Sequence, residues 1–204
     1  QGVKFHFNTE IKQLKAQGDT IVGVETSSGS FYADKYVVAL GSFAPALVKP
    51  LGIKLLIYPV KGYSITVPMQ ADLPDLQHTL MDENHKIMIT QLGRRIRAAG
   101  MAELGAYTTD AEPKQIKRLC RVVERYFPTG LDWTQLQSWA GLRPMTPDGP
   151  PILGPTPVKN LYLNSGQGSN GWTQAAGCAQ VVADTLVGEQ PELSLDGFTY
   201  DRFN

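Results

Sequence analysis

The stretch from Ser138 to Gly177 constrains the fold of this chain more than any other. It contains a short apolar run, Leu161 to Leu163, which is followed at once by glycines at positions 166, 168 and 171. Helical periodicity then extends from Trp172 to Val187. A strand, a glycine turn and a helix in this order leave backbone N–H groups at the positive end of the helix. Such groups attract phosphate, carboxylate or an electron-rich ring.

The glycines have the spacing G-x-G-x-x-G, which also occurs in dinucleotide-binding folds. That motif requires a further strand after the helix and an acidic residue about 20 positions beyond the glycines. The segment from Gly188 to Asn204 shows no parallel-strand pattern. The context therefore disfavours a dinucleotide fingerprint. Two interpretations remain, a ligand-binding turn and a tight turn that needs glycine for its backbone angles alone.

A second stretch with the same order of elements lies nearer the N-terminus. Tyr36 to Leu40 is continuously apolar, which predicts a strand buried on both faces. Gly41 ends this run, and Ser42 is placed to cap a helical turn from Phe43 to Val48. This turn is a second candidate for holding a ligand near backbone amides.

The remaining pattern predicts mostly antiparallel strands and one packing helix. Strict alternation predicts a strand at Val3 to Phe7, and Ser27 to Gly29 predicts a hairpin turn. Pro113 is expected to begin a helix, and the proline-rich stretch after Arg143 is expected to be a connection. Further extended segments are expected at Glu10 to Ala16, Ile21 to Thr26, Ser30 to Ala33, Tyr58 to Val67, Lys86 to Thr90 and Arg94 to Met101. Arg94, Arg95 and Arg97 fit a solvated strand face better than a ligand-facing surface.

Composition narrows the chemistry. Nineteen basic residues balance nineteen acidic ones among 204, so nothing indicates a nucleic-acid partner. The two cysteines, Cys120 and Cys178, lie among apolar helical residues and are expected to be buried, reduced thiols. The three histidines show no metal-ligand spacing, and no P-loop or nucleophile elbow is present. These patterns predict a soluble protein of a reducing compartment whose reactivity comes from an organic cofactor.

Three segments, taken together and in order, resemble a known family. They are ADKYVVALGSFAPALVKPLG (33–52), YPVKGYSITV (58–67), and GLRPMTPDGPPILGPT running on to NLYLNSGQGSNGW (141–172). The chain is similar over nearly its whole length to the flavin-dependent D-amino-acid oxidase and dehydrogenase superfamily, and most closely to its bacterial D-amino-acid dehydrogenases. The resemblance implies a mixed α/β fold. Residues 1–48 and 138–204 would form parts of an FAD-binding domain, and residues 49–137 would form a substrate domain with a mostly antiparallel sheet.

The resemblance also implies an activity and a set of site residues. The activity is FAD-dependent oxidation of a D-amino acid to a 2-oxo acid and ammonia, with hydride passing to the flavin and no catalytic side chain required. Arg143 would bind the substrate carboxylate, and Tyr63 and Lys61 would line the substrate pocket. Trp172 would either wall the site or sit in the core. The residues implied to contact the cofactor are Ala39, Gly41, Ser42, Gly166, Gly168, Ser169, Asn170, Gly171, Trp172 and Thr173.

The sequence departs from the family pattern in two ways. It has no counterpart of the N-terminal strand and glycine turn that hold the ADP half of FAD, so it resembles the C-terminal half of a dehydrogenase. FAD binding and activity of this piece alone are therefore in doubt. Gln167 stands where the dehydrogenases commonly have His, and Ser169 and Asn170 also differ. These changes leave the substrate preference open.

Three readings of the function follow. The first is part of a D-amino-acid dehydrogenase that passes electrons to a membrane respiratory chain, in the cytoplasm or peripheral to the inner membrane. The second is a glycine- or sarcosine-type amine oxidase of the same fold. The third is a non-catalytic domain that keeps the fold for protein–protein contact. A homodimer through the surface left by the missing half is also expected, since large apolar patches rarely stay exposed.

Overall fold

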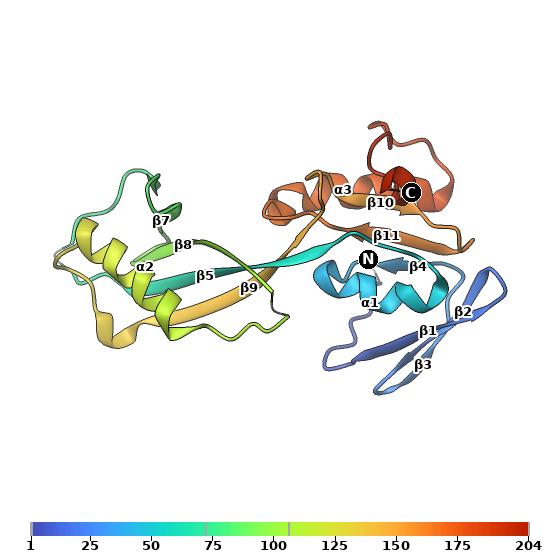
Figure 1. Ribbon diagram of the computed structural model, residues 1–204, viewed down its shortest axis with the longest axis horizontal. Helices are drawn as coiled ribbons and strands as arrows, with labels where there is room; N and C mark the ends of the chain where they lie inside the picture. The colour runs from blue at the N-terminus through green and yellow to red at the C-terminus, as the bar shows by residue number, and fades with distance from the viewer. Residues whose placement is uncertain (1, 72, 106, 204) are drawn as a thin grey trace. The chain divides into compact units, whose positions relative to one another are not determined.

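The computed structural model describes residues 2–71, 73–105 and 107–203 (Figure 1). The chain forms two compact units. The terminal unit consists of Gln1–Tyr58 and Pro144–Asn204, and the inserted unit consists of Pro59–Arg143. The sequence predicts domain boundaries near 48 and 138, and the assignment of the two units to FAD and to substrate stays a prediction. Arg143 ends the inserted unit.

The terminal unit is built on two small sheets. In one, β11 (Leu161–Ser165) pairs in parallel with β4 (Tyr36–Val38) and antiparallel with β10 (Ile152–Pro155). The helix α3 (Gly171–Val187) follows β11 directly, as predicted (Figure 1). The other sheet is an antiparallel meander, which confirms the expected hairpin. Its strands are β1 (Ile11–Gln17), β2 (Thr20–Thr26) and β3 (Gly29–Phe31).

The core of the terminal unit forms where apolar residues of the parallel strands meet the short α1 (Ala44–Val48). Ala44, Val48, Leu161 and Leu163 have no exposed surface at all. Burial of such side chains stabilises a fold by about 1.5–3 kcal/mol each. This packing fixes the ends of β4 and β11 relative to each other, and therefore the turns that follow these strands.

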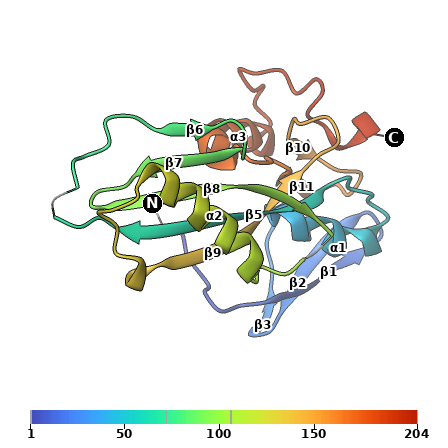
Figure 2. The ribbon, with the colours of Figure 1, turned by 60° about the vertical axis from the view of Figure 1, so that its left-hand side comes forward.

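The inserted unit contains a five-stranded sheet with the order β6-β7-β8-β5-β9. The pairs β6–β7, β7–β8 and β5–β8 are antiparallel, as the sequence predicted. Figures 1 and 2 show α2 (Pro113–Tyr126) lying along one face of this sheet. The strands are β5 (Tyr58–Pro68), β6 (Leu80–Asp82), β7 (Ile87–Gln91), β8 (Arg95–Leu104) and β9 (Gln137–Met145).

Successive side chains along these strands point to opposite faces of the sheet. One face packs on α2: Tyr63, Ile65 and Ala140 join Leu119 and Val123 in the core of the unit. The alternating residues point to the other face, which we call the Arg143 face. It carries Gly62 and Ser64 from β5, Arg97 from β8, and Trp139, Gly141 and Arg143 from β9.

Several of the sequence predictions about local structure are wrong. The proline-rich stretch that was expected to be a connection contains the strand β10. Val3 to Phe7 forms no strand, and its apolar side chains are exposed. Alternation alone does not make a strand, because no described segment pairs with this one. The strand β4 ends at Val38 and is buried on one face only, since Val37 is exposed. Ser42 does not cap a helix, because it lies inside a 3₁₀ turn, Gly41–Phe43, that precedes α1.

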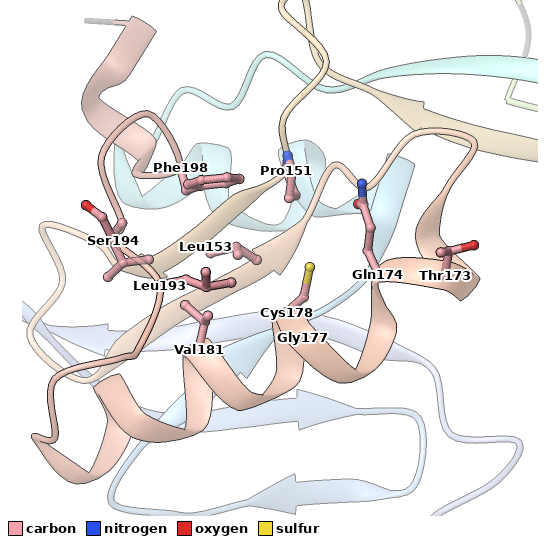
Figure 3. Close-up of a pocket in the computed structure, with 11 residues that line it drawn as sticks. Pro151, Leu153, Thr173, Gln174, Gly177, Cys178, Val181, Leu193, Ser194 and Phe198 are labelled. Carbon is pink, nitrogen blue, oxygen red and sulfur yellow. The ribbon is translucent and has the colours of Figure 1, made fainter.

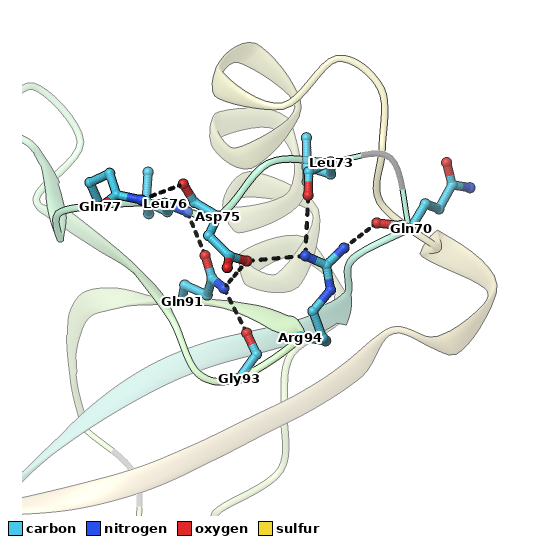
Figure 4. Close-up of polar contacts among 8 residues, drawn as sticks. All are labelled: Gln70, Leu73, Asp75, Leu76, Gln77, Gln91, Gly93 and Arg94. Atoms are coloured by element: carbon cyan, nitrogen blue, oxygen red, sulfur yellow. Dashed lines mark hydrogen bonds and ion pairs between the residues drawn. The ribbon is translucent and has the colours of Figure 1, made fainter.

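Arg94 has a structural role that alternation could not reveal. Its guanidinium donates to the Leu73 carbonyl at 3.2 Å, to Asp75 Oδ1 at 3.1 Å and to the Gln70 carbonyl (Figure 4). Gln91 donates to the same Asp75 oxygen at 2.7 Å. Hydrogen bonds from Gln91 and then from Arg94 hold the pKa of Asp75 below its ordinary value. Arg94 thus connects the loop after β5 to the turn between β7 and β8.

A second polar cluster joins the turn after β6 to the end of α2. The Asp82 carboxylate is buried and accepts from the His85 backbone N–H at 2.9 Å, from His85 Nδ1 at 3.0 Å, and from the Tyr126 hydroxyl at 3.3 Å. The hydrogen bond from the His85 backbone and those from the His85 ring and Tyr126 lower the pKa of Asp82 from 3.8. The charged form of Asp82 is therefore the one that the fold favours.

This cluster predicts a pH-dependent stability. A carboxylate whose pKa is lower in the folded state stabilises the fold above its unfolded pKa, and that contribution is lost as the pH falls through the folded pKa. We expect wild type to be more stable than Asp82→Asn at pH 7, and the difference to shrink below the ordinary value of 3.8. Urea unfolding at pH 7, 4 and 3 measures this, with the exposed Asp110→Asn as control. A stability difference that is the same at every pH would contradict the prediction.

Among the helices that the structure describes, none is long and apolar enough to cross a membrane. Both cysteines are free. Cys178 is buried and Cys120 is half-buried, and burial raises the pKa of each thiol.

Candidate active site

The Arg143 guanidinium is the best-defined candidate for binding an anion. It is half-buried near the end of β9, and Nη1 donates to the Met101 carbonyl at 2.8 Å. No carboxylate of the described residues forms an ion pair with it. Burial lowers its pKa, although a guanidinium stays charged in proteins. A half-buried cation with a single neutral partner has hydrogen-bonding capacity left for an external anion.

Gly62 and Met101 determine where this guanidinium lies. A Cβ atom added at Gly62 would stand 2.5 Å from Cζ, Nη1 and Nη2 of Arg143, so the guanidinium rests directly on the Gly62 backbone. Opposite Gly62 the register of β8 shifts, because Lys61 pairs with Glu103 whereas Tyr63 pairs with Gly100. This bulge contains Met101, whose φ of 67° is uncommon outside glycine. The Met101 carbonyl that binds Arg143 therefore comes from a β-bulge.

The sequence analysis missed both Gly62 and Met101. A glycine inside a strand often marks the close approach of another group, so Gly62 did carry a signal. Met101 carried none, because a bulge in β8 depends on how two strands pair rather than on the residues of one of them.

Lys61 and Tyr63 point to the α2 face, away from Arg143. Each is only 1% exposed. The Tyr63 hydroxyl donates to Glu103 Oε2 at 2.8 Å, and burial, followed by this contact, raises its pKa to about 12. Lys61 Nζ lies 3.5 Å from Thr108 Oγ1 and 5.3 Å from the centre of the Tyr63 ring. The structure does not bring these two side chains together with the guanidinium, and their contact with substrate stays a prediction.

The two turns of the terminal unit, by contrast, are brought together. The strands β4 and β11 are parallel, so the turns after them lie at the same edge of the sheet. Ser165 Oγ at the end of β11 donates to the Gly41 carbonyl at 3.1 Å. The Gly168 N–H donates to the Pro144 carbonyl at 2.9 Å, and Pro144 also packs on Gly41. This edge is the kind of place where open α/β sheets bind ligands.

The glycine turn leaves the start of α3 accessible. Gly166 and Gly168 have φ values of +83° and +58°, which explains the need for glycine there. Asn170 precedes the helix, but no side chain caps it. The N-terminal amides of this 17-residue helix are therefore available to an electron-rich group. Ser169, Asn170 and Thr173 are exposed.

Trp172 is 97% exposed, so the alternative that placed it in the core is wrong. Its indole stands at the start of α3, next to the glycine turn. The other alternative, that Trp172 forms a wall of the ligand site, stays a prediction.

Ser42 contributes an unusual feature to the first turn. It is only 4% exposed, yet its Oγ has no hydrogen-bond partner among the described residues. A buried hydroxyl without a partner costs about 1–3 kcal/mol, which is why such groups are rare in folded proteins. An external donor or acceptor would remove this cost. Ala39, before Gly41, is exposed.

The terminal unit also contains an apolar cavity of about 260 Å³ (Figure 3). It lies between α3, β10 and the C-terminal segment, and the Cys178 thiol and the Leu153 and Phe198 side chains face it. Thr173 and Gln174 line one end. Because its walls are mostly apolar, this cavity is not suited to binding a charged amino acid. No group of three His, Cys, Asp or Glu side chains that could hold a metal ion occurs in the described part of the chain.

Comparisons with known proteins place this site in context. A family model described as FAD dependent oxidoreductase (DAO) matches residues 1–185. The D-amino acid dehydrogenase of Rhodopseudomonas palustris (strain HaA2) is 48% identical over 202 residues, which make up 99% of this chain and 48% of that protein. The enzyme of the same name from Vibrio cholerae serotype O1 is 49% identical over 206 residues, covering 99% of this chain and 49% of that protein.

Solved structures show the same fold. The glycine oxidase of Geobacillus kaustophilus matches with a TM-score of 0.83 and 26% identity, covering 95% of this chain and 52% of that one. The L-proline dehydrogenase of P. horikoshii matches with a TM-score of 0.81 at 20% identity, covering 96% of this chain and 54% of that one. This confirms the predicted α/β architecture with an antiparallel sheet. The chain spans about half the length of the curated relatives that it matches. It belongs to the FAD dependent oxidoreductase family.

Proposed function

We propose that this chain forms part of an FAD-dependent dehydrogenase that oxidises D-amino acids to 2-oxo acids and ammonia. The observation that carries the proposal is the half-buried Arg143 guanidinium, which lacks a carboxylate partner among the described residues. Relatives that bear the name D-amino acid dehydrogenase are 46–49% identical across the chain and support the same conclusion.

In this proposal Arg143 binds the α-carboxylate of the substrate. The planar guanidinium matches the two carboxylate oxygens, and its contact with Met101 still leaves donors free. Gly62 and Met101 hold the guanidinium in one place, and the bound amino acid is thereby oriented before it reacts. Orientation of this kind is a large part of what an enzyme contributes when a cofactor performs the chemistry.

The residues of the two turns fit FAD. Ser42 Oγ needs a hydrogen-bond partner, and the uncapped start of α3 would stabilise negative charge on a bound ring. We assign the contacts with the cofactor to Gly41, Ser42, the turn from Gly166 to Gly171, and the start of α3. When bound, FAD supplies the acceptor for the hydride that leaves the substrate Cα. The chain's own residues bind and orient the substrate, and no side chain is required as a strong base.

A second candidate function is an amine oxidase of the same fold. The TM-score of 0.83 to a glycine oxidase is the observation that favours it. The two functions differ in their electron acceptor, which for a dehydrogenase would be a membrane respiratory chain and for an oxidase is oxygen. The proposal also includes association with the inner membrane and a homodimer.

The test uses the full-length gene product, purified and loaded with FAD. Anaerobic addition of D-alanine is expected to bleach the visible absorption of the flavin, whereas L-alanine is not. Adding a quinone analogue should restore the band faster than oxygen does. Rapid formation of peroxide would favour the amine oxidase. A protein that keeps FAD but is bleached by no amino acid would contradict both enzymatic functions and leave the non-catalytic reading.

A further inference from the structure

We propose that Trp139 forms the wall of a subsite for the substrate side chain, and that this subsite favours D-amino acids with large apolar or aromatic side chains. The inference rests on the proposed function, because it takes Arg143 as the anchor of the α-carboxylate. The residues that support it, Trp139, Gly141 and Arg97, lie beside Arg143 on the same face of the sheet.

Trp139, Gly141 and Arg143 alternate along β9 and therefore project from one face. The assignment is secured by Ala140, which packs into the core on the α2 face. A Cβ atom added at Gly141 would stand only 2.1 Å from Cη2 of Trp139, so the outer edge of the indole lies over the Gly141 backbone. The ring thus extends along the strand from position 139 toward Arg143. Gly141 is the residue that allows this, since any side chain there would occupy the same space.

Arg97 fixes the ring from the neighbouring strands. Its guanidinium carbon lies 5.9 Å from the centre of the Trp139 ring, and Nη2 donates to Ser64 Oγ at 3.1 Å. Ser64 is two residues from Gly62, on which the Arg143 guanidinium rests. Two residues of a strand span roughly 7 Å, so the Trp139–Arg97 pair lies about one amino acid's length from the carboxylate anchor.

Despite these contacts, 58% of Trp139 is exposed. An aromatic side chain that is held in one orientation and remains accessible is suited to contact with an apolar group, because the contact removes apolar surface from water. A methyl group such as that of D-alanine would cover little of the ring. The side chain of D-phenylalanine would cover more, and contacts of this type discriminate by roughly 10- to 200-fold.

Arg97 suggests a competing reading. It too has no carboxylate partner among the described residues, so it could instead attract an acidic side chain. We favour the apolar subsite because Arg97 already uses its guanidinium to contact the indole and Ser64. Kinetics with D-glutamate distinguish the two readings.

The experiment compares kcat/KM for D-phenylalanine, D-alanine and D-glutamate in the FAD-loaded full-length gene product. Trp139→Ala is expected to lower the ratio of kcat/KM for D-phenylalanine to kcat/KM for D-alanine by roughly 10-fold or more. Trp139→Phe should retain most of the preference. The matched control is Met88→Ala, since Met88 is an exposed apolar residue on β7, three strands and about 14 Å from β9.

The outcomes separate the subsite from the proposed function. A wild type that oxidises no D-amino acid overturns the proposed function and the subsite together. A wild type that oxidises them, with a ratio that Trp139→Ala leaves unchanged, overturns the subsite alone. A wild type that prefers D-glutamate, and loses this preference in Arg97→Gln, also overturns the apolar subsite. A fall in the ratio upon Trp139→Ala that Trp139→Phe restores supports it.

Discussion

Replacement of Arg143 by alanine is expected to reduce kcat/KM for D-amino acids by roughly a hundredfold to ten-thousandfold in the FAD-loaded full-length gene product. Two hydrogen bonds to a carboxylate contribute about 1.5–3 kcal/mol each, and 1.4 kcal/mol corresponds to a factor of ten. Most of the loss should appear as a higher KM, because the carboxylate is bound equally in the ground state and the transition state. Steady-state kinetics with D-alanine or D-phenylalanine measure the effect.

Arg143→Lys is expected to recover only part of this loss. An ammonium group keeps the charge but cannot present two parallel donors to the carboxylate. Arg94→Ala is the matched control, because Arg94 belongs to the same unit but is engaged by Leu73, Asp75 and Gln70 (Figure 4). It should lower the thermal stability and leave KM unchanged. If Arg143→Ala kept a wild-type KM, the guanidinium could not be the carboxylate anchor.

The parts of this fold that could be predicted from sequence are those that depend on local pattern. Pro113 begins α2, and the glycine turn leads into α3, as expected. Proline fixes φ at a value that suits the first turn of a helix, and glycine tolerates the positive φ that the turn needs, so both signals are local. The antiparallel hairpin of β7 and β8 followed from alternation and a turn in the same way.

The parts that could not be predicted depend on a partner segment. Val3 to Phe7 alternates as a strand should, but no described strand pairs with it. Conversely, β10 lies in the proline-rich stretch after Arg143 that was expected to be a connection, and it forms because β11 lies beside it. A segment becomes a strand only when another strand pairs with it, so the pattern of one segment alone does not decide whether a strand forms.

The candidate site shows the same division. Arg143 and the two glycine turns could be named from their residues and from the family resemblance. The contacts that give Arg143 its position could not, because they depend on the packing of β5 against β9 and on the bulge in β8. Tyr63 and Lys61 show that the type of a residue does not give the direction of its side chain. Their chemistry suits a pocket, but the pleat of β5 points them toward α2.

Gly62→Ala is expected to lower kcat/KM by roughly a hundredfold while changing the thermal stability little. The new Cβ atom would stand 2.5 Å from three atoms of the guanidinium, so Arg143 must move by about an ångström. Displacements of this size in a substrate-positioning group can cost about a factor of 100. The cost to the fold should be small, because the group that moves is the end of a flexible side chain and Gly62 needs no positive φ.

A double-mutant cycle isolates this effect. If Gly62 acts only by positioning Arg143, then Gly62→Ala should have no further effect on kcat/KM in an Arg143→Ala background. Gly177→Ala is the matched control, since a Cβ atom there meets nothing within 4 Å. It should leave kcat/KM unchanged. Additive losses in the double variant would mean that Gly62 acts on the site independently of Arg143, and would refute the positioning role. Coupled losses would show that a glycine inside a strand decides where the substrate carboxylate binds.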